Sequence, residues 1–290
     1  MNKTSFSKII AGTMTWGVWG KDCNTKQMIE LMNCCLENNI TTFDHADIYG
    51  DYTTETAFGI AFRESKIDRN NIQLISKCGI QMPSEIRKNT VKHYDYSTSY
   101  IIRSVEQSLK NLQTDYLDLL LLHRPSPLMK ADEIAEAIGK LKEDGKIIDF
   151  GVSNFTPAQM NLIETGTKIH YNQIKFSITD FEAMLNGTLD HMQTHKIIPM
   201  CWSPLGTVFK KDDERSHRIK KMAAHFSLKY TVSVDVILLA WILKHPSAIL
   251  PVCGTADPAR IANLMKAATV EMELQDWFAL WSESSGVPVP

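Results

Sequence analysis

Four ionisable side chains follow apolar segments of the sequence, and together they could donate a proton to a carbonyl oxygen. Asp44 ends the segment ITTFD and Tyr49 lies shortly after it, Lys77 ends QLISK, and His123 follows a run of leucines. An ammonium group beside a phenol favours the phenolate, so Lys77 is expected to bring the pKa of Tyr49 down toward neutrality, where Tyr49 can be a general acid. Asp44 would keep Lys77 charged, and His123 would hydrogen-bond the substrate oxygen.

Each of these residues also has an ordinary structural interpretation. An aspartate at a strand end is often a helix N-cap, a loop tyrosine usually packs with one hydrogen bond, and a histidine after a leucine run is often a core residue. Lys77 is the exception, because lysine is rarely buried without a partner. The four types arriving together at the ends of apolar segments favour a catalytic site.

Eight short segments have the composition of strands, and most are nearly continuous apolar runs, which is typical of strands buried on both faces. They are residues 6–12, 39–44, 71–77, 116–123, 146–153, 169–176, 197–203 and 248–254. Helical patterns fall between them, as in Met28, Leu31, Met32 and Cys35. Thr156-Pro157 and Asp257-Pro258 each resemble an N-cap followed by proline at the first helical position.

Alternating strands and helices are compatible with an open doubly wound sheet or a closed barrel. No GxGxxG follows the first strand, which removes the main support for a Rossmann sheet. Eight units in 290 residues match an eight-stranded parallel (β/α)8 TIM barrel in an α/β chain, with one domain over residues 1–290. The long connection at 207–232 is expected to hold a loop and an extra helix.

In such a barrel the chemistry lies on the rim formed by the C-terminal ends of the strands. Nearly every predicted strand ends there in a polar or aromatic residue. In chain order these residues are Gly12, Thr13, Met14, Asp44, Lys77, His123, Ser153, Asn154, Gln173, Trp202, Ser203, Gly254 and Thr255. A barrel without a site would not need this pattern.

The bulk composition excludes several classes of protein. The net charge is −2 and basic residues form no dense run, which argues against a nucleic-acid partner. The sequence shows neither an apolar run of membrane-span length nor a signal-peptide pattern, and its six cysteines have no paired CxxC spacing. We therefore expect a cytoplasmic protein with no metal site and no membrane partner.

The motifs resemble those of the aldo-keto reductases. They are FDHADIYG, ISKCG, LLLLHRP, GVSNF, YNQ, WSPLG and GTADPARIAN, which run in the family's order from about residue 12 to residue 264. The chain is especially similar to a small bacterial oxidoreductase branch with DHADIYG and HRPxPLM. The resemblance implies a barrel that binds NADPH (NADP⁺) across the C-terminal rim, a small carbonyl substrate, and a monomer.

The resemblance also implies roles for individual residues. Asp44, Tyr49, Lys77 and His123 match the family's catalytic set. Three further groups match its cofactor site: a carboxamide-binding set, an aromatic that stacks on nicotinamide with its following loop, and a motif for the adenosine 2′-phosphate and adenine. They are Ser153, Asn154 and Gln173; then Trp202, Ser203, Leu205 and Gly206; then Gly254, Thr255, Arg260 and Asn263.

The cofactor site departs from the family pattern in three places. Tryptophan at 202 stands where tyrosine or phenylalanine is common, and some relatives have lysine near Cys253-Gly254 and asparagine at Leu264. Arg260 remains, and its planar fork suits a phosphate, so we expect NADPH to bind more tightly than NADH.

The substrate pocket is the least specified part of the sequence. We expect Trp16, Trp19 and His45 to line it, together with the long segment 79–97 and the tail after residue 280. Small aldehydes or ketones, including aromatic ones, are the expected substrates.

Three alternatives remain at this stage. A barrel aldolase could use Lys77 as a Schiff base. A non-catalytic NADPH-binding regulator could carry the same rim, as in one branch of the family. A metal enzyme is the third, with His45 and Asp47 as ligands, although a third ligand is not evident.

Overall fold

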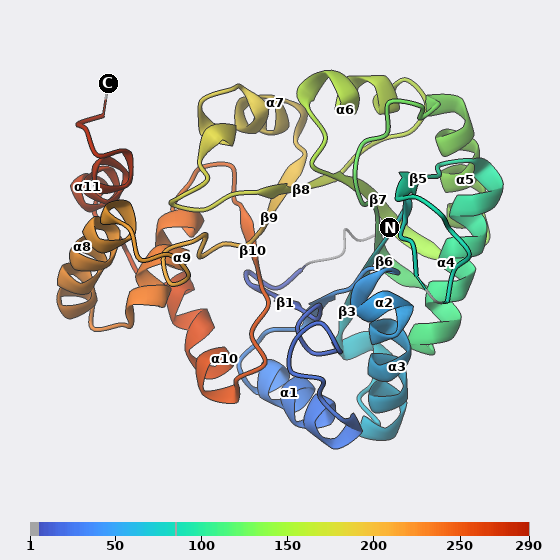
Figure 1. Cartoon of the computed structure of the whole chain (residues 1–290), viewed down its shortest axis with the longest axis horizontal. Coiled ribbons are helices and arrows are strands. Elements are labelled where there is room, and N and C mark those ends of the chain that lie inside the picture. Colours follow the sequence, from blue (N-terminus) through green and yellow to red (C-terminus); the bar gives the residue numbers. More distant parts are fainter. Residues whose placement is uncertain (1–5, 85, 290) are drawn as a thin grey trace.

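The computed structural model describes residues 6–84 and 86–289, which form a closed barrel of parallel strands surrounded by helices (Figure 1). The strand order around the barrel is β1-β10-β9-β8-β7-β6-β3-β2. This confirms the predicted (β/α)8 fold and all eight predicted strands. The strand bounds are Ile10–Gly12 (β1), Thr42–Asp44 (β2), Gln73–Cys78 (β3), Leu117–Leu122 (β6), Ile147–Ser153 (β7), Tyr171–Lys175 (β8), Ile198–Trp202 (β9) and Leu250–Cys253 (β10).

The strands are apolar throughout because both of their faces are buried. In β6, Leu119 and Leu121 face the barrel interior, where they pack with Ile75 and Met200. The alternate residues Leu120 and Leu122 belong to the larger core between the barrel and the helices. A strand with one solvated face would show alternating polarity instead, so the continuous runs follow from the two-sided burial.

Helices cover the outside of the barrel in alternation with the strands. Their bounds are Thr25–Glu37 (α1), Tyr49–Tyr52 (α2), Thr54–Ser65 (α3), Thr98–Leu112 (α4), Ala131–Glu143 (α5), Pro157–Glu164 (α6), Thr188–His195 (α7), Glu214–Tyr230 (α8), Val234–Leu243 (α9), Pro258–Leu264 (α10) and Leu274–Ser285 (α11), with 3₁₀ turns at Arg69–Asn71, Glu182–Met184 and Met265–Thr269. The extra helix expected within 207–232 is α8, which packs against α11 at the left of Figure 1.

The predicted helix starts are confirmed. Thr156 caps α6 with a capping box and Pro157 in the first turn, and Asp257 caps α10 by accepting a hydrogen bond from the backbone N–H of Ala259. Proline lacks an N–H that the first turn would leave unpaired, so this placement has no hydrogen-bond cost.

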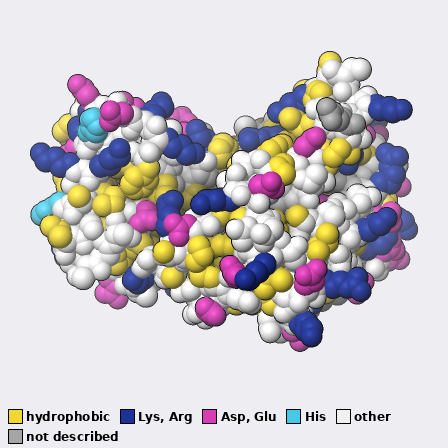
Figure 2. Space-filling view, turned by 60° about the horizontal axis from the view of Figure 1, so that its bottom comes forward, with side chains coloured by type: hydrophobic (Ala, Val, Ile, Leu, Met, Phe, Trp, Pro, Cys, Tyr) yellow, Lys and Arg dark blue, Asp and Glu magenta, His cyan; other side chains and the backbone are white. Residues whose placement is uncertain are grey.

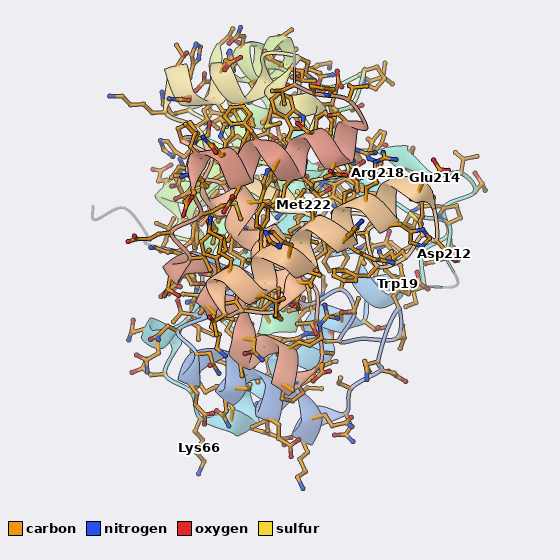
Figure 3. All side chains as sticks on the ribbon, turned by 90° about the vertical axis from the view of Figure 1, so that its left-hand side faces the viewer. Trp19, Lys66, Asp212, Glu214, Arg218 and Met222 are labelled. Atoms are coloured by element: carbon orange, nitrogen blue, oxygen red, sulfur yellow. The ribbon has the colours of Figure 1, made fainter. Side chains whose placement is uncertain are left out.

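The loops at the two ends of the barrel lie on opposite sides of the molecule. In Figure 3, Trp19 of the loop after β1 and Asp212 of the loop after β9 lie at the same edge. Lys66, which ends α3 before the chain enters β3, lies at the other edge. The loops that follow the strands therefore meet on one rim, as the fold requires for a shared site.

The predicted long loop 79–97 is partly ordered as a hairpin. Ile80–Gln81 (β4) and His93–Tyr94 (β5) form an antiparallel pair outside the barrel. Gly79 begins this excursion with φ +111°, and the ring of Tyr96 lies where a Cβ at Gly79 would be. Any other residue at this position would collide with Tyr96, so glycine is needed for the chain to leave β3 in this direction.

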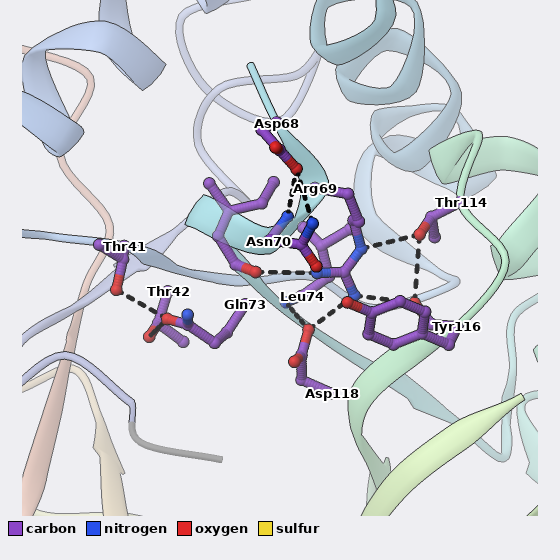
Figure 4. Close-up of polar contacts among 11 residues, drawn as sticks. Thr41, Thr42, Asp68, Arg69, Asn70, Gln73, Leu74, Thr114, Tyr116 and Asp118 are labelled. Atoms are coloured by element: carbon purple, nitrogen blue, oxygen red, sulfur yellow. Dashed lines mark hydrogen bonds and ion pairs between the residues drawn. The ribbon is translucent and has the colours of Figure 1, made fainter. Parts of the chain in front are cut away.

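The opposite end of the barrel is held by a network around Arg69 (Figure 4). Its guanidinium binds the Asp118 carboxylate at 2.7 Å, the Ile72 and Tyr116 carbonyls, and the Thr114 hydroxyl. Asp118 also accepts from the backbone N–H of Leu74 at 2.8 Å, which ties β6 to β3. This arginine has a purely structural set of partners.

No single helix among residues 6–84 and 86–289 has both the length and the apolar character to cross a membrane. The pair α8 and α9 passes that test only together, and the two helices are bent by 88° at their junction.

Candidate active site

Asp44, Tyr49 and Lys77 form one compact cluster at the rim of the barrel. Asp44 ends β2, Lys77 lies in β3 beside it, and Tyr49 begins the short α2. The Lys77 Nζ is 2.7 Å from the Asp44 Oδ2 and 3.1 Å from the Tyr49 hydroxyl, and it also donates to the His45 carbonyl at 2.8 Å. The predicted cluster is therefore present with direct contacts.

His123 completes the set from the next strand. It follows β6, and its ring lies 6.0 Å from the Tyr49 ring in an edge-to-face arrangement. Burial lowers the pKa of His123 well below its ordinary value, and the nearby Lys77 lowers it further. The imidazole is therefore neutral at physiological pH and can donate or accept one hydrogen bond at each nitrogen.

Lys77 remains charged although its side chain is fully buried. Burial lowers its pKa, but the Asp44 carboxylate and the Tyr49 hydroxyl outweigh this effect and raise the pKa above its ordinary value. All three ammonium protons have acceptors, so the charge is both paired and hydrogen-bonded. The prediction that Asp44 keeps Lys77 charged is confirmed.

The predicted lowering of the Tyr49 pKa is wrong in this structure. Burial raises the pKa of Tyr49 above its ordinary value, and the Lys77 ammonium opposes this only in part. The Asp44 carboxylate contributes in the same direction as burial, because it disfavours a second negative charge nearby. Tyr49 is thus a phenol that holds its proton throughout the neutral pH range.

A chain of hydrogen bonds connects this cluster to the polar residues of β7 and β8. The Gln173 amide donates to the Asp44 Oδ1 at 2.9 Å, and the Ser153 hydroxyl donates to the Gln173 carbonyl at 2.9 Å. The Asn154 amide donates to Ser153 at 2.7 Å and accepts from the Trp202 indole at 2.9 Å. The predicted carboxamide set and the predicted stacking ring are therefore adjacent to each other and to the catalytic cluster.

The turn after β9 has a backbone shape that restricts its residues. Ser203 has φ +53° and Gly206 has φ +54°, and the Gly206 N–H donates to the Ser203 carbonyl at 2.8 Å. A Cβ at Gly206 would lie 2.0 Å from the Thr179 Oγ1, so only glycine fits. Leu205 is half-buried between them, packed against the core.

The face of the barrel seen in Figure 1 becomes the upper edge of Figure 2, and this edge is hollowed between two raised parts. Lysine and arginine side chains border the hollow on both sides (Figure 2). A paired lysine, a protonated phenol and a neutral imidazole at the base of such a rim can donate a proton to a bound carbonyl oxygen.

The comparison with known families identifies this arrangement. The sequence profile of the Aldo/keto reductase family matches residues 8–281. The chain belongs to this family. It is 39% identical over 291 residues to "Uncharacterized oxidoreductase YcsN" of Bacillus subtilis (strain 168), with 98% of this chain and 96% of that protein aligned. This aldo-keto reductase is therefore an oxidoreductase.

Two further relatives bear on its chemistry. The "6-dehydroglucose reductase" of Agrobacterium fabrum is 35% identical over 289 residues, covering 97% of each chain. The solved structure of an aldo-keto reductase from Klebsiella pneumoniae "in complex with NADPH" superposes with a TM-score of 0.78 at 25% identity, covering 98% of this chain and 92% of that one. Both resemblances extend over nearly the whole barrel.

The predicted cofactor residues at the end of β1 mainly hold the neighbouring strand β2 in place. Gly12 ends β1 beside β2, and Thr13 is fully buried with its hydroxyl donating to the Asp44 carbonyl at 3.0 Å. Met14 is 42% exposed at the start of the following loop. The Thr13 N–H also donates to the Asp44 carbonyl and its own carbonyl accepts from Trp16, so Thr13 supports the rim, and Met14 is the exposed side chain of this segment.

The predicted 2′-phosphate residues lie on and before α10. Gly254 and Thr255 follow β10, and their carbonyls accept from Thr15 and Trp16. The Arg260 side chain is 49% exposed and lies 3.7 Å from the Asp235 carboxylate, while the Asn263 amide donates to the Ala259 carbonyl. Arg260 is free to turn toward an anion, because so exposed an ion pair is weak.

Two residues expected to contact substrate lie elsewhere. Trp16 is fully buried, packs on Phe43 and Phe58, and donates its indole N–H to Thr255. His45 is also fully buried against Phe58, and burial lowers its pKa to about 3. Both point into the core between the barrel and its helices, which corrects the expectation that they line the pocket. Trp19 is 44% exposed, with its ring 6.3 Å from that of Tyr49.

Two features of the site were missed from the sequence. Arg124, directly after His123, lies over the Trp202 ring with its Cζ 5.3 Å from the centroid. In addition, Asp47 and Glu55 are both buried and line the same cavity of about 230 Å³. The motif HRP includes Arg124, so the sequence contained a signal for the first feature. The shared burial of Asp47 and Glu55 depends on tertiary packing, which no local pattern shows.

The structure offers no support for the metal alternative. Among residues 6–84 and 86–289, no group of three or more histidine, cysteine, aspartate or glutamate side chains could hold a metal ion.

Proposed function

We propose that this protein is an NADPH-dependent oxidoreductase that reduces a small aldehyde or ketone to the alcohol, with Tyr49 as the general acid. The observation that carries the proposal is the direct contact of the Tyr49 hydroxyl with a buried, paired Lys77 at 3.1 Å. The family membership and the NADPH in a solved relative support the choice of cofactor. The products are the alcohol and NADP⁺, and one proton is consumed.

The residues of the rim fit the cofactor. Trp202 is half-buried at a strand end, its indole N–H is held by Asn154, and its ring would stack on a nicotinamide. Ser153, Asn154 and Gln173 would hold the carboxamide, and the turn at Ser203, Leu205 and Gly206 would approach the pyrophosphate. Arg260 and Asn263, with Gly254 and Thr255, would hold the adenosine end. When bound, NADPH supplies the hydride.

The chain's own residues position the carbonyl and supply the proton. Tyr49 donates its hydroxyl proton to the carbonyl oxygen as negative charge develops there, and Lys77 stabilises the phenolate that remains. His123 donates a hydrogen bond to the same oxygen. Asp44 fixes the Lys77 ammonium, and Gln173 fixes Asp44, so the acid is oriented before substrate arrives.

The decisive experiment compares the wild type with Tyr49→Phe. Purified protein is titrated with NADPH and with NADH by nucleotide fluorescence, and a panel of aldehydes and ketones is then added while the oxidation of NADPH is followed. We expect Tyr49→Phe to bind NADPH like the wild type and to lose turnover by at least about 100-fold, the usual contribution of a general acid. A fully active Tyr49→Phe enzyme would refute the role.

Tyr52→Phe is the matched control. Tyr52 lies in the same helix, but its hydroxyl accepts from the Met82 N–H in the hairpin segment and does not contact Lys77. NADPH binding without oxidation of NADPH by any carbonyl would favour the regulator alternative instead. Equal affinity for NADPH and NADH would contradict the assignment of Arg260. Monomeric state and cytoplasmic location stay predictions from the sequence.

The aldolase alternative has a specific obstacle in the structure. A Schiff base requires a neutral lysine amine, whereas all three protons of Lys77 are hydrogen-bonded and its pKa is raised. Trapping of a carbonyl substrate on Lys77 by borohydride would nevertheless overturn our proposal.

A further inference from the structure

Arg124 is held rigidly at the site by its backbone. It follows His123 directly, and the hydroxyl of the buried Tyr96 both donates to the Arg124 carbonyl and accepts from the Arg124 N–H at 3.1 Å. Tyr96 comes from the segment after the β4–β5 hairpin. The backbone of Arg124 is therefore held by the segment that follows the hairpin.

The guanidinium of Arg124 lies beside the ring predicted to stack on the nicotinamide. Its Cζ lies over the Trp202 ring, 5.3 Å from the centroid. It is also close enough to lower the pKa of both His123 and Tyr49 by its charge. Arg124 is therefore next to the ring of Trp202, which would stack on the nicotinamide, and directly follows His123 in the chain.

Two other cations of this rim, Lys77 and Lys175, are each paired with a carboxylate. Lys77 binds Asp44 at 2.7 Å, and Lys175, which also lies over Trp202, binds Asp180 at 2.5 Å. The Arg124 guanidinium makes no ion pair and no hydrogen bond with any residue in the described part of the chain. A partly buried guanidinium is usually hydrogen-bonded, as Arg69 is at the other end of the barrel (Figure 4).

We propose that Arg124 determines specificity by binding a carboxylate on the carbonyl substrate, so that the preferred substrates are aldehydes or ketones that carry an acid group a few carbons away. This inference rests on the proposed reductase function. A carboxylate matches the planar fork of a guanidinium with two parallel hydrogen bonds. Lys92, exposed on the hairpin segment and also lowering the pKa of His123, adds positive potential at the same side of the site.

The test uses substrates that differ only in charge. Succinic semialdehyde is compared with its methyl ester, and 4-carboxybenzaldehyde with methyl 4-formylbenzoate, by measuring kcat/KM with saturating NADPH. We expect the wild type to prefer the acid of at least one pair by about tenfold or more, because a charge-assisted hydrogen bond is worth one to two orders of magnitude in binding. Turnover of the esters establishes the proposed function independently of this preference.

Two substitutions of Arg124 test whether this residue causes the preference for the acid over the ester. Arg124→Gln should reduce the acid-to-ester ratio to near one, and Arg124→Lys should keep part of it, since a lysine retains the charge without the fork. Lys175→Gln is the matched control, because it removes the other cation over Trp202, and it should leave the ratio unchanged. The NADPH dissociation constant of each variant is measured by fluorescence in parallel.

Several outcomes would overturn the inference. One is a wild-type ratio near one for both pairs, and another is an Arg124→Gln variant that keeps the wild-type ratio. If Arg124→Gln weakens NADPH binding and lowers kcat/KM for acid and ester equally, Arg124 serves the cofactor and not the substrate. Absence of NADPH oxidation with both acids and both esters, together with the wider carbonyl panel, would instead count against the proposed function itself.

Discussion

Gln173 donates a hydrogen bond of 2.9 Å to the Asp44 carboxylate, joining two residues that are 129 positions apart in the chain. Both side chains are buried. The contact links the strand that carries the predicted carboxamide site to the carboxylate that holds Lys77. In the proposed function, the Gln173 amide therefore connects cofactor binding to the orientation of Lys77 and Tyr49.

Removing the Gln173 amide tests this connection. In Gln173→Met the Asp44 Oδ1 loses its donor in a buried site, which should lower the free energy of unfolding by about 1–3 kcal/mol and also lower kcat. Urea unfolding and NADPH-saturated turnover measure the two effects. The same change at the exposed Gln107, on α4, should alter neither; a Gln173→Met enzyme with wild-type kcat would show that the link is dispensable.

The pH dependence of reduction follows from the direction of the Tyr49 shift. A general acid must carry its proton, and burial raises the pKa of Tyr49 above its ordinary value. The rate of reduction should therefore be flat across neutral pH and decline only above about pH 10, the ordinary tyrosine pKa. The measurement is kcat at saturating substrate over this range. A decline between about pH 7 and pH 9 would mean that bound substrate or cofactor lowers the Tyr49 pKa, as the sequence analysis expected.

The buried Asp47 predicts how stability varies with pH. Burial, assisted by the nearby Glu55, raises the pKa of Asp47 from 3.8 to about 7. Because the pKa of Asp47 is higher in the folded state, the folded protein binds a proton at this residue that the unfolded chain releases at lower pH. The free energy of unfolding therefore decreases as the pH rises from about 4 to about 7. The full shift corresponds to a loss of up to about 4 kcal/mol over that interval.

Asp47→Asn removes this titration and should be relatively more stable than the wild type at pH 7 than at pH 4. Urea unfolding at the two pH values measures the difference. The exposed Asp212, substituted in the same way, provides a control for general charge effects. Parallel stability curves for the wild type and Asp47→Asn would show that folding does not raise the pKa of Asp47.

Alanine substitutions at Gly206 and Gly187 distinguish the cost of backbone strain from the cost of steric collision. Both have positive φ, but a Cβ at Gly206 would meet Thr179 and Ser177, whereas a Cβ at Gly187 would meet nothing within 4 Å. Gly206→Ala should destabilise the protein by more than Gly187→Ala, whose cost is about 1 kcal/mol. Gly206→Ala should also weaken NADPH binding, because the turn after β9 must shift to make room for the added methyl group. Equal effects at both positions would argue against a rigid turn after β9.

Much of the architecture was predictable because it rests on local patterns. The continuous apolar runs predicted all eight barrel strands, since strands buried on both faces cannot alternate in polarity. Thr156-Pro157 and Asp257-Pro258 predicted two helix starts from capping chemistry alone. The position of Asp44, Lys77 and His123 at strand ends then placed them on one rim without any knowledge of distances.

The sequence by itself therefore determined the barrel, the family and the gathering of Asp44, Tyr49 and Lys77 on one rim, because periodicity, capping and motif order are properties of neighbouring residues. Tertiary structure alone decided which side chains are buried and which are paired. It placed Trp16 and His45 in the core and raised the pKa of Tyr49 by burial despite the nearby Lys77. It also left Arg124 beside Trp202 with no ion pair to any of residues 6–84 and 86–289. Desolvation and ion pairing depend on groups distant in the chain that packing brings together, so no local pattern can report them.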